Sequence, residues 1–196
     1  MKFLSFTLLF CALSMPALAG VLPGEEAPDF TLTDTVGNEH QLDSYLQDGK
    51  IVVLEWFNPD CPFIVKHHKK NKTMNEAYAK VKEQDVVWLA INSSAKGKQG
   101  YGLERNQKAV KDFEMPFPVL LDPTGEVGLS YGAKTTPHMF VITPDGTVAY
   151  NGAIDDNSSV ATLGKTNHLL AALHNLLQDN DVKIAETKPY GCSVKY

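Results

Sequence analysis

The feature that most constrains the fold is an apolar run followed at once by a turn and a cysteine. Residues 51–57 form a continuous apolar segment that only Glu55 interrupts. Such a segment is typical of a central strand that is buried on both faces of a sheet. Asn58-Pro59-Asp60 then turns the chain, and Pro62 suits the first position of a helix. The sequence therefore predicts that Cys61 lies between a buried strand and a helix.

The rest of the chain alternates short apolar strands with helical segments, without a repeat or linker that would divide it. This order predicts one α/β sandwich with a mixed sheet, an N-terminal hairpin extension and a C-terminal tail. We place the domain at residues 20–180 and the tail, which carries Cys192, at residues 181–196. The expected elements are a hairpin over 30–42, strands at 86–91, 119–121, 139–142 and 148–150, and helices over 62–81, 103–113 and 167–178. We expect the first helix to be interrupted near Asn71-Lys72 and to present a solvated, lysine-rich outer face.

The first nineteen residues predict a signal for export. Met1-Lys2 gives a short positive start, residues 3–15 are apolar apart from Ser and Thr, and Ala17-Leu18-Ala19 carries the small residues of a cleavage site. A membrane span needs roughly 20 apolar residues, and Pro16 breaks this run earlier. We therefore expect cleavage before Gly20 and a periplasmic or extracellular product without stable membrane insertion.

Composition excludes one class of partner. The chain has 18 Lys and Arg against 23 Asp and Glu, which gives a net charge of −5. Binding to nucleic acid requires clustered basic residues, so we expect no such partner. Three cysteines are too few for a disulfide-stapled small protein. Cys11 lies within the export signal, which leaves Cys61 and Cys192 in the mature chain.

Cys61 is placed where a thiol can be reactive. The free N–H groups and the positive end of a helix dipole favour a thiolate at a helix start. Asp60 opposes this effect by its charge, and Lys66 is positioned to offset Asp60. The alternative is an inert buried cysteine, which is a common fate of a lone Cys. We favour the reactive thiol because the cysteine follows a strand-ending turn.

Four segments within residues 26–178 form one pattern: APDF at 27–30, WFNPDCPFI at 56–64, YGAKTTPHMFVI at 131–142, and the hairpin of Asp145-Gly146 with 150–152. Together they cover most of that range and resemble the thioredoxin-like redoxin superfamily, which includes AhpC/TSA-type antioxidant peroxidases and secreted thiol-disulfide oxidoreductases. The tail KPYGCSVKY at 188–196 makes the subgroup with a single CPF cysteine and a GCSVKY tail the most similar. The resemblance implies a thioredoxin-like fold in which Thr136 pairs with extended substrate and Pro137, as a cis residue, shields Cys61. Sequence alone leaves the trans isomer open.

Two departures from that superfamily bear on mechanism. Ile64 stands where two-cysteine thioredoxins have their second cysteine, so Cys61 needs another partner. Asn58 and Leu54 stand where typical peroxiredoxins have Thr or Ser and Pro, and Arg105 is the only arginine. The usual donors that stabilise a peroxide transition state are therefore absent.

Cys192 is the candidate partner of Cys61. Its glycine-hinged segment could fold back over the site, and the pair could then cycle between dithiol and disulfide. A static disulfide is the alternative, because closing so long a loop stabilises a protein by about 5 kcal/mol in the chain-entropy account. A third interpretation is a copper(I) carrier that uses Cys61, Cys192 and His138 without turnover.

We therefore predict a secreted thiol-dependent oxidoreductase that reduces a small hydroperoxide or exchanges with a disulfide. Cys61 is expected as the nucleophile and Cys192 as the resolving cysteine, with Thr136, Pro137, His138 and Asn58 lining the substrate site. No motif for a flavin, nicotinamide or haem is present, so an external dithiol must supply the electrons. We expect no bound metal and no cofactor. The alternative function is a copper(I)-handling protein, or a redox-inert binding protein with a structural Cys61–Cys192 disulfide.

Overall fold

The computed structural model describes residues 20–196, so the expected export signal lies outside the described residues. Its strands are β1 (Thr31–Asp34), β2 (Glu39–Gln41), β3 (Ile51–Trp56), β4 (Val86–Asn92), β5 (Val119–Leu121), β6 (Thr135–Thr136), β7 (Met139–Ile142), β8 (Val148–Gly152) and β9 (Cys192–Ser193). Seven of them form one sheet in the order β2-β1-β5-β4-β3-β7-β8. β3 pairs parallel to β4 and antiparallel to β7, which confirms the mixed sheet.

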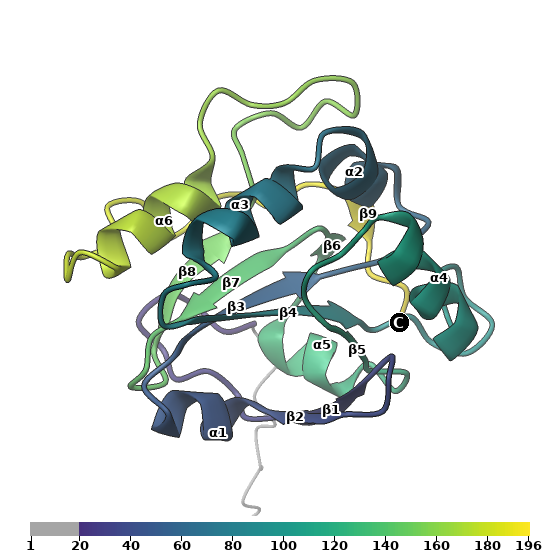
Figure 1. Ribbon diagram of the computed structural model, residues 1–196, viewed down its shortest axis with the longest axis horizontal. Coiled ribbons are helices and arrows are strands. Elements are labelled where there is room, and N and C mark those ends of the chain that lie inside the picture. The colour runs from purple at the N-terminus through teal and green to yellow at the C-terminus, as the bar shows by residue number, and fades with distance from the viewer. Residues whose placement is uncertain (1–19) are drawn as a thin grey trace, which may run out of the picture.

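Helices cover both faces of this sheet, as Figure 1 shows. They are α1 (Leu42–Gln47), α2 (Pro62–Ile64), the π-helix η1 (Val65–Lys70), α3 (Thr73–Val81), α4 (Leu103–Asp112), α5 (Glu126–Tyr131) and α6 (His168–Leu176). Apolar residues of α3, α4 and α6 pack on one face, and those of α1 and α5 pack on the other. No helix within residues 20–196 is long and apolar enough to cross a membrane.

The central strand β3 divides its side chains between two cores. Val53 packs in the core under α3 and α6, whereas Val52, Leu54 and Trp56 pack in the core that contains α5. All six residues of β3 are buried. The apolar run, broken only by Glu55, is therefore needed because successive side chains of a strand point to opposite faces, and both faces are covered here.

The helix after Cys61 is broken where the sequence predicted. α2 has three residues and continues into η1, whose backbone includes a bond from the N–H of Asn71 to the carbonyl of Lys66 at 3.1 Å. Lys72 then adopts a left-handed conformation with φ 54° before α3 begins. The prediction of a solvated lysine face was wrong for Lys66, which is 0% exposed. Its amine faces inward because it donates to the carbonyl of Asn157 at 2.8 Å.

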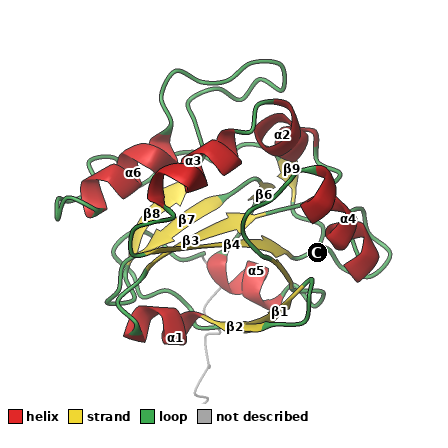
Figure 2. Ribbon diagram, in the orientation of Figure 1, coloured by secondary structure: helices red, strands yellow, loops and turns green. Residues whose placement is uncertain are grey.

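The tail, residues 181–196, packs along the domain in an extended path. Thr187 donates its backbone N–H to the carbonyl of Asn151 at 3.1 Å, and β9 then pairs antiparallel with β6. Beyond β9, Val194 is buried in the core that contains α5. Figure 2 shows β9 beside β6 above the main sheet. Helices α1 and α5 and the strands β6 and β9 were not expected from the sequence.

Candidate functional site

Cys61 occupies the junction between β3 and α2. Its N–H donates to the carbonyl of Asn58 at 3.0 Å, and its own carbonyl accepts from the N–H of Val65 at 3.0 Å. Cys61 therefore closes the turn with one group and begins the helix with the other. Its side chain is 0% exposed and belongs to the apolar core under α3 and α6. The sequence-based placement of this residue is confirmed.

The sulfur atoms of Cys61 and Cys192 lie 2.8 Å apart, and both cysteines are free thiols. An S–S bond is about 2.05 Å long, so a shift of about 0.8 Å would join them. The Cys61 sulfur also lies 2.9 Å from the carbonyl oxygen of Thr136, to which the thiol donates. Within residues 20–196, no backbone N–H donates to this sulfur. Burial and the contact with Cys61 raise the pKa of Cys192 to about 12.

The strand pairing of the tail is what brings the two cysteines together. Cys192 lies opposite Thr136, and Ser193 lies opposite Thr135, in the antiparallel β6–β9 pair. The Thr136–Pro137 peptide bond is cis, the isomer that the sequence left open. The carbonyl oxygen of Thr136 contacts the Cys61 sulfur, and the backbone of Thr136 pairs with Cys192 on β9.

His138 lies next to this strand but makes its contacts elsewhere. Its Nδ1 accepts from the backbone N–H of Lys134 at 3.2 Å, and its Nε2 donates to Oδ1 of Asn151 at 2.7 Å. Burial lowers the pKa of His138 to about 4, so it is neutral at pH 7. Because both ring nitrogens are engaged, neither is available to bind copper or exchange a proton with Cys61. Within residues 20–196, no three His, Cys, Asp or Glu residues are grouped to hold a metal ion.

Asn58 and Arg105 organise the turn before Cys61. Oδ1 of Asn58 accepts from the N–H of Asp60 at 2.9 Å, and its Nδ2 donates to the carbonyl of Gln99 at 3.0 Å. Arg105, on α4, donates from Nε to the Asp60 carboxylate at 2.9 Å and from a terminal nitrogen to the carbonyl of Pro59 at 3.2 Å. Arg105, rather than Lys66 as the sequence suggested, therefore balances the charge of Asp60.

A buried polar cluster around Tyr190 was missed in the sequence. The hydroxyl of Tyr190 bonds to the Asp155 carboxylate, lies 3.0 Å from Nε2 of His67 and accepts from the Lys66 amine at 3.4 Å. Lys66 Nζ also lies 3.8 Å from the other oxygen of Asp155. Burial lowers the pKa of Lys66, whereas burial and then Asp155 raise that of Tyr190. The one feature of the sequence that could have indicated this cluster is Tyr190 itself, an aromatic residue two positions before Cys192.

A buried pair of side chains links the sheet to η1. His68 Nε2 and Glu55 Oε1 are 2.7 Å apart, and both side chains are 0% exposed. The ring of Phe57 packs edge-on against His68 with centroids 5.4 Å apart. Glu55, the one interruption of the apolar run in β3, therefore has a partner from η1.

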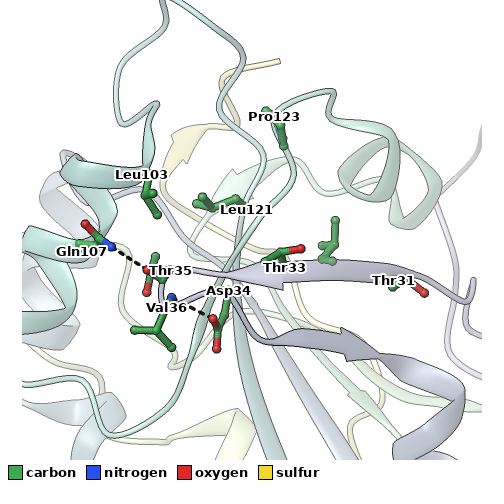
Figure 3. Close-up of a pocket in the computed structure, with 11 residues that line it drawn as sticks. Thr31, Thr33, Asp34, Thr35, Val36, Leu103, Gln107, Leu121 and Pro123 are labelled. Carbon is green, nitrogen blue, oxygen red and sulfur yellow. Dashed lines mark hydrogen bonds between the residues drawn. The ribbon is translucent and has the colours of Figure 1, made fainter.

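The cavity in Figure 3 lies away from the cysteines. It has a volume of about 610 Å³ and lies between β1 and the start of α4, with Thr35, Val36, Leu103 and Gln107 among its lining residues. Neither Cys61 nor Cys192 lines it, so this cavity contributes nothing to the arrangement around the two sulfurs.

Comparison with known protein families identifies the family to which this chain belongs. The AhpC/TSA family pattern matches residues 23–151, more than half of the chain. The chain belongs to the AhpC/TSA family. This confirms the resemblance to thioredoxin-like redoxins, although the matched region of this AhpC/TSA protein ends before Cys192 and the rest of the tail.

Individual relatives point to the same superfamily. The thiol-disulfide oxidoreductase ResA of Bacillus thuringiensis subsp. konkukian is 33% identical over 129 residues, which are 64% of this AhpC/TSA protein and 66% of ResA. The chain therefore spans slightly less than two thirds of that relative. A hypothetical protein from Sinorhizobium meliloti 1021 superposes with a TM-score of 0.76 at 27% identity, over 91% of this chain and 96% of its own. The thioredoxin domain of a Bacteroides vulgatus thiol-disulfide oxidoreductase superposes with a TM-score of 0.55 at 21% identity, over 67% and 89% of the chains. The fold is thioredoxin-like.

Proposed function

We propose that this protein is a thiol-disulfide oxidoreductase whose Cys61 and Cys192 cycle between dithiol and disulfide. The observation that carries the proposal is the 2.8 Å separation of the two sulfurs within one chain. The similarity to ResA, a thiol-disulfide oxidoreductase by name, supports the same chemistry. The copper(I) alternative loses its third ligand, because both nitrogens of His138 are engaged.

The reaction exchanges two electrons with an outside partner. A substrate disulfide takes two electrons from the Cys61 and Cys192 thiols, and its two sulfurs leave as thiols while the pair becomes a disulfide. An external dithiol then reduces the pair and is itself oxidised to a disulfide. Reduction of a hydroperoxide is the other branch expected from the sequence. We place the disulfide branch first because Arg105, the one arginine, is bound to Asp60 rather than free to polarise a peroxide.

Turnover assays test the proposal directly. The reduced protein should oxidise when mixed with a small disulfide such as oxidised glutathione, and dithiothreitol should restore both thiols. Cys61→Ser and Cys192→Ser should each abolish formation of the intramolecular disulfide, whereas Ser193→Ala, an exposed neighbour, should leave it intact. Consumption of hydrogen peroxide, followed in the same samples, separates the two substrate classes. A Cys61–Cys192 bond that resists dithiothreitol would instead identify a static disulfide.

We also infer that the protein acts after export. The charged start, apolar run and Ala17-Leu18-Ala19 of the first nineteen residues support cleavage before Gly20. An oxidising compartment allows a Cys61–Cys192 disulfide to persist between reactions. The intact mass of the protein expressed with residues 1–19 in a bacterial host should correspond to a chain that begins at Gly20. Recovery of the full-length chain from the cytoplasm would contradict the inference.

A further inference from the structure

We propose that, in the oxidised protein, an incoming thiol attacks the sulfur of Cys192, and Cys61 is the sulfur that leaves. This inference rests on the proposed function, since it requires a Cys61–Cys192 disulfide. The sequence predicted Cys61 as the nucleophile that attacks the substrate and Cys192 as the resolving cysteine, which would make Cys61 the sulfur that meets the outside partner. Three features of the site favour the reversed order: burial, direction of attack and anchoring of the tail.

Burial distinguishes the two cysteines. Cys61 is 0% exposed, so no part of it is in contact with solvent. Cys192 is partly exposed and is followed by the exposed Ser193 on the short strand β9. A cavity of about 670 Å³, lined in part by Thr135, Tyr190 and Gly191, extends along the tail up to the residue before Cys192. An outside reactant therefore reaches Cys192 first.

The direction of attack leads to the same sulfur. A thiolate displaces the leaving sulfur from behind the attacked one, along the line of the S–S bond, and access decides which sulfur is attacked. An attack on Cys61 would have to begin on its side away from Cys192, but Cys61 is 0% exposed on every side and packs in a core with Phe57, Ile64 and Met139. Cys192 keeps part of its surface exposed, so a thiolate can approach it without displacing the core.

The tail that covers Cys61 is held on both sides of Cys192. Before it, the Tyr190 hydroxyl is bound by Asp155 and His67. After it, the Val194 N–H donates to the carbonyl of Lys134 at 3.2 Å, and the Tyr196 hydroxyl donates to the carbonyl of Ala133 at 2.9 Å. Exposing Cys61 would break these contacts, whereas attack on Cys192 breaks none of them.

The electrons and protons balance in this order. The donor thiolate forms an S–S bond with Cys192, the Cys61–Cys192 bond breaks, and its electron pair goes to the Cys61 sulfur, which takes a proton from water. The new Cys61 thiol can donate to the Thr136 carbonyl, as it does in the structure at 2.9 Å. The second thiol of the donor then attacks the donor sulfur bound to Cys192. The Cys192 sulfur leaves and is protonated, so two electrons and two protons have passed from donor to pair.

Trapping of the mixed disulfide tests the order. The oxidised full chain is mixed with glutathione, a monothiol, quenched within seconds with N-ethylmaleimide, and digested for mass spectrometry. Glutathione should be found on Cys192 and N-ethylmaleimide on Cys61, with at least about tenfold less glutathione on Cys61, because only the accessible sulfur is attacked. Glutathione mainly on Cys61, or equally on both, would overturn the inference. Either of these two outcomes would leave the proposed function intact, because a Cys61–Cys192 disulfide would still have formed and been reduced.

Single-cysteine variants give an independent readout. Cys192 in Cys61→Ser should react with oxidised glutathione at least about tenfold faster than Cys61 does in Cys192→Ser, because the tail still covers Cys61. Adding Tyr190→Ala to Cys192→Ser should expose Cys61 and remove most of that difference, whereas adding Tyr101→Ala, at an exposed tyrosine, should not. Equal rates in the two single-cysteine variants would contradict the inference. A wild-type chain that forms no Cys61–Cys192 disulfide on oxidation would overturn the proposed function as well.

Discussion

Gly191 packs so closely against Thr136 that a side chain at position 191 has no room. A Cβ built on Gly191 would overlap the carbonyl oxygen of Thr136 and lie 2.7 Å from its carbonyl carbon. Gly191 also has φ +150°, which side chains rarely adopt. The same Thr136 oxygen contacts the Cys61 sulfur, so the glycine allows the tail to reach the strand that positions both cysteines.

Gly191→Ala should therefore detach β9 from β6. We expect slower formation of the Cys61–Cys192 disulfide under mild oxidation and alkylation of Cys61 that is faster by about tenfold, because the thiol becomes accessible. Gly97→Ala is the matched control, since Gly97 also has positive φ but a Cβ added there would meet nothing within 4 Å. The measurement is mass spectrometry after timed treatment with iodoacetamide. Unchanged alkylation in Gly191→Ala would show that the contact does not hold the tail.

Tyr190→Phe should weaken the attachment of the tail to the domain while keeping the aromatic ring in place. The change removes the hydroxyl that bonds to Asp155, His67 and Lys66. Leaving buried polar groups without a partner costs about 1–3 kcal/mol, so the free energy of unfolding should fall by that amount. Urea denaturation measures the change, and Tyr101→Phe, at a 40% exposed residue, provides the comparison. Equal stability of the two variants would show that the hydrogen bonds of the Tyr190 hydroxyl contribute little to stability.

The buried Glu55–His68 pair gives a larger expected effect. Glu55→Ala leaves His68 without its partner in a fully buried position, and breaking a buried pair in this way typically costs about 3–5 kcal/mol. Glu83→Ala removes the carboxylate of an exposed pair with Lys82 and should cost about 0–1 kcal/mol. Chemical denaturation of both variants provides the test. A Glu55→Ala protein as stable as Glu83→Ala would mean that the buried pair contributes little.

Stability should fall as the solution is acidified below pH 6.5. Burial lowers the pKa of His138 from 6.5 to about 4, and burial together with Lys66 lowers that of His67 from 6.5 to about 4. Between pH 6.5 and about pH 4, both histidines are protonated in the unfolded chain but neutral in the folded chain. The free energy of unfolding therefore decreases with falling pH, by up to about 1.4 kcal/mol per pH unit for each histidine. Urea titrations from pH 7 to pH 4 should show a smaller slope in His138→Gln, and an unchanged slope would exclude His138 as a source.

The sequence predicted the parts of the site that local pattern determines. The apolar run of β3, the turn at Asn58-Pro59-Asp60 and the proline that begins α2 are contiguous, and together they place Cys61 correctly. The β7–β8 hairpin was also predicted, because Pro144-Asp145-Gly146 is a tight turn between two apolar strands. Each of these features depends on neighbouring residues alone.

The tail could not be placed from local pattern. Strand β9 has two residues, too few for an alternation of apolar and polar side chains to be visible. Its position depends on contacts far apart in the sequence, such as Tyr190 with Lys66 and Val194 with the core around α5. The burial of Lys66 was missed for the same reason, because its partner Asp155 lies in a loop beyond β8.

The most direct test of the account is an equilibrium redox titration of the full chain in dithiothreitol buffers, with free thiols counted by mass after alkylation. The account predicts one two-electron transition in which Cys61 and Cys192 lose their thiols together, in a monomeric product. The transition should be absent from Cys61→Ser and from Cys192→Ser. A wild-type protein that keeps both thiols at every potential, or that forms only disulfides between chains, would contradict the central claim.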